Sequence, residues 1–167
     1  KVFAIDVGYG QLAYSLQIYP RVVVMDRTNS RFLTRDDLGE SVDLVVADLS
    51  FISLKTVFPA ITRILKENGC ALLLVKPQFE IGKGRVGKKG IVRRAEDHIG
   101  VLEECCHFFR ESGWRIVGVV PSPIAGKSGN IEFFLHGKPG PGGEEIMHEQ
   151  IHAAVRDAHE KVDGRHE

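Results

Sequence analysis

Three charged residues, Asp48, Lys76 and Glu132, have the types and spacing that could act together on a substrate hydroxyl. Asp48 ends one run of apolar residues, Lys76 ends the next, and Glu132 lies within a later run. A carboxylate inside an apolar strand is costly unless it is paired. A lysine held between two acids can stabilise or abstract charge at a hydroxyl group. The alternative interpretation is a structural ion pair, with Glu132 facing water on an edge strand.

The elements that must position these residues follow from the periodicity of the apolar side chains. Strands are predicted at Lys1–Val7, Arg21–Asp26, Asp43–Asp48, Cys70–Val75, Arg115–Val120 and Ile131–His136. Helices are predicted at Gln11–Ile18, Leu54–Lys66, Ala95–Ser112 and from Glu144 onward. Strands that alternate with helices are typical of a Rossmann-like α/β fold with a mostly parallel sheet. The connection over residues 121–130 is too short for a crossover helix, so the last two strands should form a C-terminal antiparallel hairpin.

Two local features of this scaffold can also be predicted. The β-branched runs at Arg21–Asp26 and Asp43–Asp48 indicate strands that are covered on both faces, and Asn68–Gly69 is typical of a helix C-terminus. Ligands of α/β sheets bind beyond the carboxyl ends of the strands. The charged residues at these ends are Asp6, Asp26, Asp48 and Lys76. They could also be strand-end charges that simply meet solvent.

The composition of the chain excludes several classes of protein. Its 167 residues, 43% of them apolar, are enough for one sizeable core. Lys and Arg together number 22, as do Asp and Glu, which excludes a uniformly basic binding protein. Three cysteines cannot form a disulfide framework and indicate free, mostly buried thiols in a reducing cytoplasm. The longest apolar run is too short to cross a bilayer, and the chain opens on a strand without an initiator Met. We therefore expect the N-terminal part of the fold to be missing.

The net charge of zero is distributed unevenly, with a basic loop and an acidic C-terminal tail. Lys76–Arg94 contains seven cations and one anion, whereas Glu144–Glu167 contains seven anions and three cations. The glycine-rich loop that follows Lys76 could clamp RNA phosphates. Its candidate residues are Lys83, Arg85, Lys88, Lys89, Arg93 and Arg94. Phe51 and Phe79 lie near the same strand ends and could stack on a splayed base. A solvated surface loop and two core phenylalanines are the alternative interpretation.

Six segments of the chain resemble the TlyA family. These are hemolysin A-like proteins that act as 2′-O-methyltransferases on ribosomal RNA cytidines, with an FtsJ-like catalytic domain. The segments follow the family's order within about residues 1–136 and are Ala4–Leu12, Arg27–Asn29, Asp48–Leu54, Val75–Glu80, Val86–Gly90 and Gly129–Phe133. The resemblance implies an S-adenosylmethionine-dependent fold and a Lys-Asp-Lys-Glu catalytic tetrad, whose last three members match Asp48, Lys76 and Glu132. The family's first lysine, its glycine-rich loop and its S4-type RNA-binding domain would precede Lys1.

The resemblance also implies a role for each candidate residue. Asp6 would accept hydrogen bonds from the cofactor ribose, Asn29 would lie near the adenine, and Asp48 would face both cofactor and substrate. An acid at Asp6 would equally suit a nicotinamide dinucleotide, and Asn29 would equally suit a turn. The implied partners are ribosomal RNA or ribosomal subunits, with no membrane and no metal. Residues 1–137 would form the methyltransferase domain, lacking its first strand and glycine-rich loop, and residues 138–167 would add a Pro/Gly break and an acidic helix.

Three other functions stay open on the residues alone. An amino-group methyltransferase could use Asp48–Phe51 as its acceptor site, but it would leave Lys76 and Glu132 without a role. A dinucleotide-binding oxidoreductase would need a glycine-rich fingerprint upstream of Lys1. An RNA-binding or membrane-lytic protein without enzymatic activity would fit the hemolysin name of the family. The sequence shows neither a spanning segment nor a long amphipathic stretch with one apolar and one basic face.

One motif points to different chemistry. His148–His152 fits the H-E-x-x-H signature of zinc proteases, and on a helix its two histidines would share a face. A third histidine in the longer protease pattern would fall at position 158, which is Ala158, and His159 is one residue away. The motif also lies in an acidic tail after the last predicted strand. Metal binding without catalysis by His148, His152 and His159 is therefore the better interpretation than a protease site.

Overall fold

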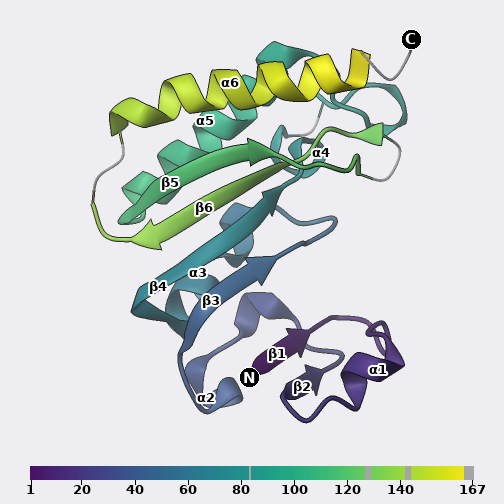
Figure 1. Cartoon of the computed structure of the whole chain (residues 1–167), viewed down its shortest axis with the longest axis vertical. Coiled ribbons are helices and arrows are strands. Elements are labelled where there is room, and N and C mark those ends of the chain that lie inside the picture. The colour runs from purple at the N-terminus through teal and green to yellow at the C-terminus, as the bar shows by residue number, and fades with distance from the viewer. Residues whose placement is uncertain (83, 127–128, 142–143, 164–167) are drawn as a thin grey trace.

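The computed structural model describes residues 1–82, 84–126, 129–141 and 144–163 (Figure 1). The strands are β1 (Val2–Ile5), β2 (Val22–Met25), β3 (Val42–Ala47), β4 (Leu65–Val75), β5 (Trp114–Pro121) and β6 (Phe133–Pro139). The α-helices are α1 (Tyr14–Gln17), α2 (Arg35–Leu38), α3 (Leu54–Ile64), α4 (Pro77–Glu80), α5 (Ala95–Glu111) and α6 (Glu144–Asp163). Two short 3₁₀ turns, η1 (Ser30–Phe32) and η2 (Lys88–Gly90), complete the chain.

The strands form two sheets. Strands β1 and β2 pair in parallel, with Val2 opposite Val22. The second sheet has the order β3-β4-β6-β5, in which β3 and β4 are parallel and β6 runs antiparallel to both β4 and β5. This mixed sheet confirms the predicted α/β fold with a C-terminal antiparallel hairpin. Within the described residues β1 pairs only with β2, and β3 pairs only with β4.

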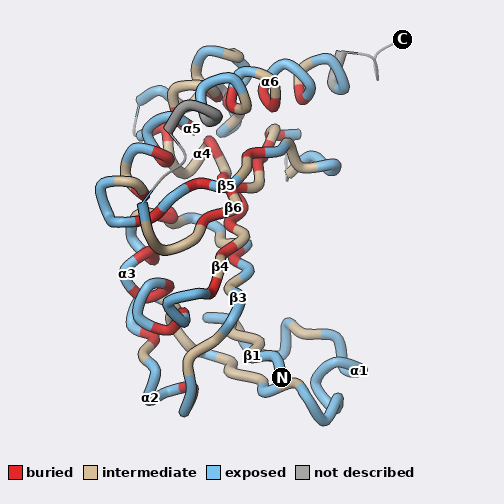
Figure 2. Tube along the Cα trace, turned by 60° about the vertical axis from the view of Figure 1, so that its left-hand side comes forward, coloured by how far each residue is buried: buried red, intermediate tan, exposed pale blue. Residues whose placement is uncertain are grey.

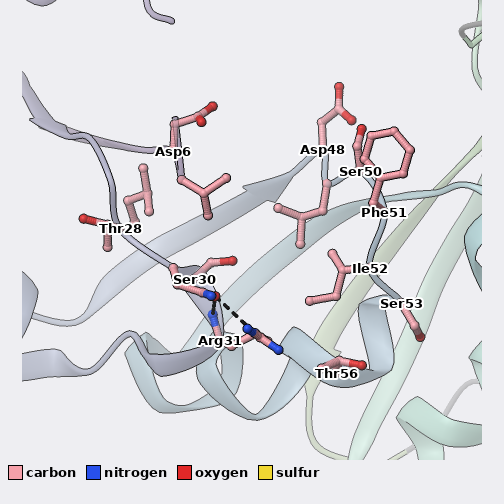
Figure 3. Close-up of a pocket in the computed structure, with 14 residues that line it drawn as sticks. Asp6, Thr28, Ser30, Arg31, Asp48, Ser50, Phe51, Ile52, Ser53 and Thr56 are labelled. Carbon is pink, nitrogen blue, oxygen red and sulfur yellow. Dashed lines mark hydrogen bonds between the residues drawn. The ribbon is translucent and has the colours of Figure 1, made fainter. Parts of the chain in front are cut away.

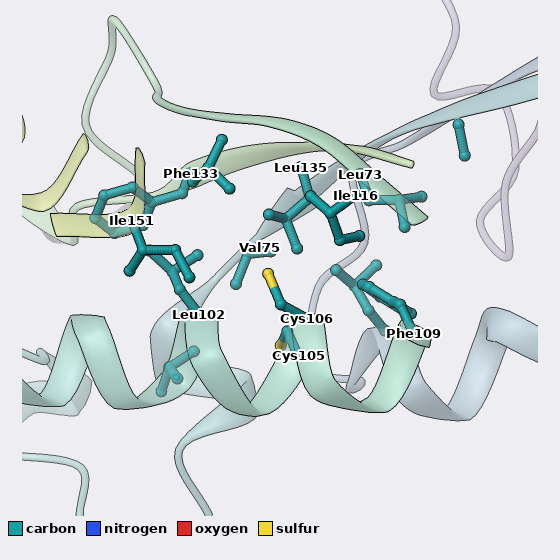
Figure 4. Close-up of a cluster of buried hydrophobic side chains, with 14 of the residues drawn as sticks. Leu73, Val75, Leu102, Cys105, Cys106, Phe109, Ile116, Phe133, Leu135 and Ile151 are labelled. Atoms are coloured by element: carbon teal, nitrogen blue, oxygen red, sulfur yellow. The ribbon is translucent and has the colours of Figure 1, made fainter. Parts of the chain in front are cut away.

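One face of the larger sheet carries the core. Alternate residues of β4 and β6, including Leu73, Val75 and Leu135, are almost fully buried against α3 and α5. Figure 4 shows these strand residues above Leu102 and Phe109 of α5. A strand with this alternation buries one side chain in two, because successive side chains point to opposite faces.

The opposite face is more open than the sequence predicts. Leu44 and Val46 of β3 are 53% and 63% exposed, and the trace of β3 in Figure 2 changes colour along its length accordingly. The prediction that Asp43–Asp48 is covered on both faces is therefore wrong for the described residues. In β2, Val23 is also 37% exposed. A run of β-branched residues indicates a strand, but it does not show whether other elements cover both faces of the sheet.

The junction of α3 and β4 also differs from the prediction. The helix ends at Ile64, and Leu65 already has extended backbone angles and pairs with Val42 of β3. Asn68–Gly69 therefore lies inside β4, at a register shift in the pairing with β3, and does not end the helix. The prediction of a helix end was wrong because the glycine has another role here, which is to let two strand backbones come close together. A Cβ at Gly69 would lie 2.9 Å from the Asp43 carbonyl oxygen.

The last helix belongs to the same core. Its residues Ile151, Ala154, Val155 and Ala158 are buried, and α6 packs against both α5 and β5. All three cysteines are free, and Cys105 and Cys106 are fully buried in this core, as the sequence predicts. Among the described residues, none of the helices combines the length and the apolar character needed to cross a bilayer.

Candidate active site

Four charged residues occupy the ends of four parallel strands. Asp6, Asp26, Asp48 and Lys76 directly follow β1, β2, β3 and β4. The carboxyl ends of parallel strands in α/β sheets are where ligands bind. Two of these carboxylates hold the loop that follows β1, since Asp6 Oδ1 accepts from the Gly8 amide at 2.6 Å and Asp26 Oδ2 accepts from the Gly10 amide at 2.9 Å.

A pocket of about 730 Å³ opens between the ends of β1 and β3 (Figure 3). Asp6, Asn29 and Asp48, the three predicted cofactor residues, all line it. Asn29 is also a turn residue, which was the alternative interpretation of its sequence position. Its Oδ1 accepts a hydrogen bond from the Arg31 amide at 3.1 Å and caps η1. The structure therefore brings the three predicted residues to one cavity, with carboxylates on two of its sides.

The ammonium of Lys76 is fixed beside this pocket. Its Nζ lies 2.8 Å from Asp48 Oδ1 and donates to Ser50 Oγ at 3.2 Å. The side chain of Lys76 is only 14% exposed, whereas that of Asp48 is 67% exposed. An ammonium has three protons to donate, so two are held by the protein and one can serve a ligand. Ser50, which the sequence places only in the candidate acceptor segment Asp48–Phe51, is thus a partner of the ammonium.

Glu132 lies in the same region but does not pair with Lys76. Its side chain is buried, and its Oε1 accepts a 3.2 Å hydrogen bond from Gln78 Nε2. The interpretation of a lysine flanked directly by both acids therefore needs correction: Asp48 contacts the ammonium, and Glu132 is held by an amide. Gly126 packs so closely on Glu132 that a Cβ at position 126 would overlap the carboxylate.

Glu80 links α4, which follows Lys76, to the start of α3. Its Oε2 accepts from Ser53 Oγ at 2.6 Å, and its Oε1 accepts from the Leu54 amide at 2.7 Å. These contacts fasten α4, which follows Lys76, to the first turn of α3, which follows the Asp48 loop. A carboxylate at a helix N-terminus is stabilised by the unpaired amides there. No local sequence pattern indicates this role, because Glu80 lies 27 positions from Ser53.

Phe51 lines the pocket, and Phe79 lies next to it. Phe51 is 89% exposed and has a φ of 63°, in the left-handed region that bulky residues rarely adopt. Its ring lies 5.2 Å from that of Phe79, centroid to centroid. A large exposed aromatic held in a strained conformation is unlike a core residue, and such strain collects at ligand sites.

The basic loop lies directly after α4. Lys89 and Arg93 are exposed and make no ion pair within the described part of the chain. Arg85 and Arg94 are each 3.4 Å from a carboxylate, on Glu104 and Glu96 respectively. Of the other predicted phosphate-binding residues, Lys83 lies outside the described residues, as does the side chain of Lys88.

A buried asparagine joins this loop to the strand that carries Glu132. Asn130 Oδ1 accepts from the Val92 amide and its Nδ2 donates to the Gly90 carbonyl, both at 3.0 Å. Asn130 precedes Glu132 by two residues, so the end of the loop is fixed next to the candidate catalytic carboxylate. A loop anchored in this way keeps its exposed cations close to the site.

The chain matches the model of a known family. Residues 1–138 match the family of FtsJ-like methyltransferases. The chain therefore belongs to the FtsJ-like methyltransferase family.

Several named relatives share this sequence. The chain is 53% identical over 138 residues to the 16S/23S rRNA (cytidine-2′-O)-methyltransferase TlyA of Mycobacterium tuberculosis, covering 80% of this chain and 50% of that protein. It is 34% identical over 137 residues to Hemolysin A of Brachyspira hyodysenteriae, covering 81% and 57%. The structure of a candidate hemolysin from Streptococcus thermophilus superposes with a TM-score of 0.93 at 35% identity, over 98% of this chain and 60% of that one. The chain thus spans about half the length of the curated relatives it matches.

Proposed function

We propose that this chain is the catalytic part of an S-adenosylmethionine-dependent methyltransferase that modifies ribose 2′-hydroxyls of ribosomal RNA. The observation that carries the proposal is the fixed Lys76 ammonium, 2.8 Å from Asp48, beside a pocket lined by Asp6 and Asp48. The relative named TlyA carries this activity in its name and is 53% identical to the chain. An amino-group acceptor site would need no such lysine, so the geometry favours a hydroxyl.

Lys76 would act at the 2′-oxygen. With two of its protons held by Asp48 and Ser50, the ammonium can direct the third at the ribose hydroxyl. The 2′-oxygen would bond to the transferred methyl carbon and release its proton to water, and the electron pair of the broken carbon–sulfur bond would stay on sulfur. A preorganised cation lowers the free energy of the negative charge that develops on the oxygen. Glu132, held by Gln78, would orient the groups around this ammonium.

The pocket fits the proposed cofactor in the chemistry of its walls. Asp6 uses Oδ1 to hold the Gly8 amide, and its other oxygen has no partner among the described residues. A carboxylate oxygen at the end of this strand can accept hydrogen bonds from the ribose hydroxyls. Asn29 would lie near the adenine. S-adenosylmethionine supplies a methyl group already activated on a sulfonium, so the protein needs only to position the acceptor and stabilise its charge.

The RNA would approach over the basic loop and the exposed aromatic. Lys89 and Arg93, together with the predicted Lys83, Arg85, Lys88 and Arg94, would neutralise backbone phosphates. The ring of Phe51 could stack on a base splayed out of the RNA, since unstacked bases bind to aromatic faces. This placement would bring the ribose of the same nucleotide toward Lys76.

The longer protein would complete the site. We propose that it carries an upstream S4-type RNA-binding domain, the first lysine of the tetrad and a glycine-rich loop for the cofactor. Its partners would be ribosomal RNA or ribosomal subunits, which places it in the cytoplasm. Residues 1–137 would be the methyltransferase domain, and residues 138–167 would extend it.

The proposal is tested by the position of the transferred methyl group. The full-length protein is incubated with methyl-labelled S-adenosylmethionine and unmodified bacterial ribosomal subunits, and the RNA is hydrolysed in alkali. A 2′-O-methyl group blocks cleavage at its own position, so we expect the label in alkali-stable dinucleotides. Label in mononucleotides would indicate base methylation and support an amino-group acceptor. No transfer to subunits or free RNA would contradict the enzymatic function and favour a binding protein on this fold.

A further inference from the structure

A cluster of metal-binding side chains lies far from the strand ends, on the surface between α5 and α6. It consists of Glu103 on α5 and of His148 and His152, which are one turn apart on α6. One ligand atom from each residue lies within 4.8 Å of the other two. His148 Nδ1 is 3.2 Å from Glu103 Oε1, and the two imidazole rings are 4.4 Å apart between centroids.

The two helices are fixed relative to each other by the core beneath this cluster. Ile151 and Val155 of α6 are buried in the same apolar cluster as Leu102 of α5. Figure 4 shows Ile151 beside Leu102 and Phe133. Ile151 directly precedes His152, and Leu102 directly precedes Glu103. The backbone positions of the candidate ligands are therefore set by packing, and a metal would need only small changes of side-chain rotamer.

The donor set selects the kind of ion. Two imidazole nitrogens and one carboxylate oxygen suit Zn²⁺, which takes tetrahedral coordination from such ligands, whereas Ca²⁺ and Mg²⁺ prefer oxygen alone. Ligand atoms around a tetrahedral Zn²⁺ are about 3.4 Å apart. The present separations of up to 4.8 Å are close enough to contract onto one ion.

We propose that Glu103, His148 and His152 form a Zn²⁺ site that fastens α6 to α5, with water in the fourth position. The ion would lie between His148 Nδ1 and Glu103 Oε1, which are 3.2 Å apart. The role is structural, since all three ligands are exposed on the helix surface and none lines the pocket at the strand ends. His159, which the sequence analysis grouped with these histidines, is excluded because it bonds to His98 at 2.9 Å. The proposal does not depend on methyl transfer.

The test measures unfolding of the full-length protein with Zn²⁺ and with a chelator. At a Zn²⁺ concentration about a hundredfold above Kd, the unfolding midpoint of a domain of this size should rise by about 5–10 °C. His152→Ala and Glu103→Gln should abolish the rise, while their unfolding in chelator stays close to that of the wild type. The matched controls are His107→Ala and Glu111→Gln, which remove exposed residues of α5 outside the cluster and should keep the full rise.

Co²⁺ provides a second readout that does not depend on stability. Bound at this site in place of Zn²⁺, it should give the visible absorption of a tetrahedral ion at one equivalent per chain, and His152→Ala should remove it. A rise in midpoint or an absorption band that persists in both cluster variants would overturn the proposal, since the metal would then bind elsewhere. The absence of any Zn²⁺ effect on the wild type would overturn it as well.

Discussion

Gln78 Nε2 donates a 3.2 Å hydrogen bond to Glu132 Oε1, which joins the helix after Lys76 to the strand that carries the buried carboxylate. The other polar atom of the amide, Gln78 Oε1, is buried and has no partner among the described residues. A buried amide with one unused acceptor is costly unless a further group completes it. We therefore expect Gln78 to position Glu132, with one acceptor left for a substrate.

Replacing Gln78 tests this positioning role. Gln78→Leu should lower kcat by about 10- to 100-fold with little change in the KM for S-adenosylmethionine, because the carboxylate loses its orientation but the pocket stays intact.

The control for this variant is Gln17→Leu, which removes an exposed glutamine of α1 that bonds only to the Leu12 carbonyl. A Gln78→Leu enzyme with the wild-type kcat would show that the hydrogen bond has no part in positioning.

Gly126 gives an independent way to move the same carboxylate. A Cβ at this position would overlap Glu132 Oε1, so Gly126→Ala should push the side chain away from Gln78. We expect a loss of activity of about 10-fold or more with an unchanged circular dichroism spectrum. Gly118→Ala is the matched control, because a Cβ there meets nothing within 4 Å. Equal activity of both variants would mean that Glu132 can shift without consequence.

Asp6 provides a test of the cofactor side of the pocket. If its carboxylate holds the cofactor ribose, Asp6→Ala should weaken S-adenosylmethionine binding by about 10- to 100-fold, as expected for loss of a hydrogen bond to a charged group. Calorimetric titration of the full-length protein measures this directly. Asp36→Ala, at an exposed position of α2, should bind like the wild type. Wild-type affinity in Asp6→Ala would place the ribose elsewhere.

A buried histidine makes the stability of the fold depend on pH. His98 is fully buried on α5, and burial, reinforced by the neighbouring His159, lowers the pKa of His98 to about 4. The Val92 backbone and Asp97 act in the opposite direction but are weaker. An unfolded histidine has a pKa of about 6.5. Between these two values the unfolded chain binds a proton that the native chain does not, so stability falls as the pH drops from about 6.5 to 4.

The size of this effect can be measured by urea unfolding. The loss across the window should reach about 3 kcal/mol for a fully buried group. His98→Met should remove that part of the pH dependence, whereas His107→Met, which replaces an exposed histidine of the same helix, should leave it in place. An identical pH dependence in the wild type and His98→Met would mean that His98 does not titrate as the structure indicates.

Much of the scaffold could be predicted because its elements are long and strongly periodic. The helix at Ala95–Glu111 and the antiparallel pairing of β5 with β6 follow the sequence closely. Short elements such as α2 and α4, of four residues each, gave no period to detect. The division of the chain at residue 137 stays a prediction, although α6 packs into the common core.

The charged residues of the site and the contact between Asp48 and Lys76 were predictable, but the partner of Glu132 was not. Strand ends identified Asp48 and Lys76, because parallel strands place their carboxyl ends at one edge. The hydrogen bond from Gln78 to Glu132 links residues 54 positions apart, and no local pattern specifies such a contact. The exposed Phe51 was equally hard to assign, since its type suggested the core and only its backbone conformation shows otherwise.

The most direct measurement is the single-turnover rate of alkali-stable labelling of ribosomal RNA by the wild type and by Lys76→Met. We expect a loss of about 10²- to 10³-fold in this variant, as for removal of a preorganised charge-stabilising donor, with S-adenosylmethionine binding retained. Lys66→Met is the matched control, since Lys66 pairs with Asp43 at 2.7 Å across the same two strands but away from the pocket. A Lys76→Met rate within about twofold of the wild type would contradict the proposed role of Lys76 at the 2′-oxygen, because the ammonium would then make no contribution to the reaction.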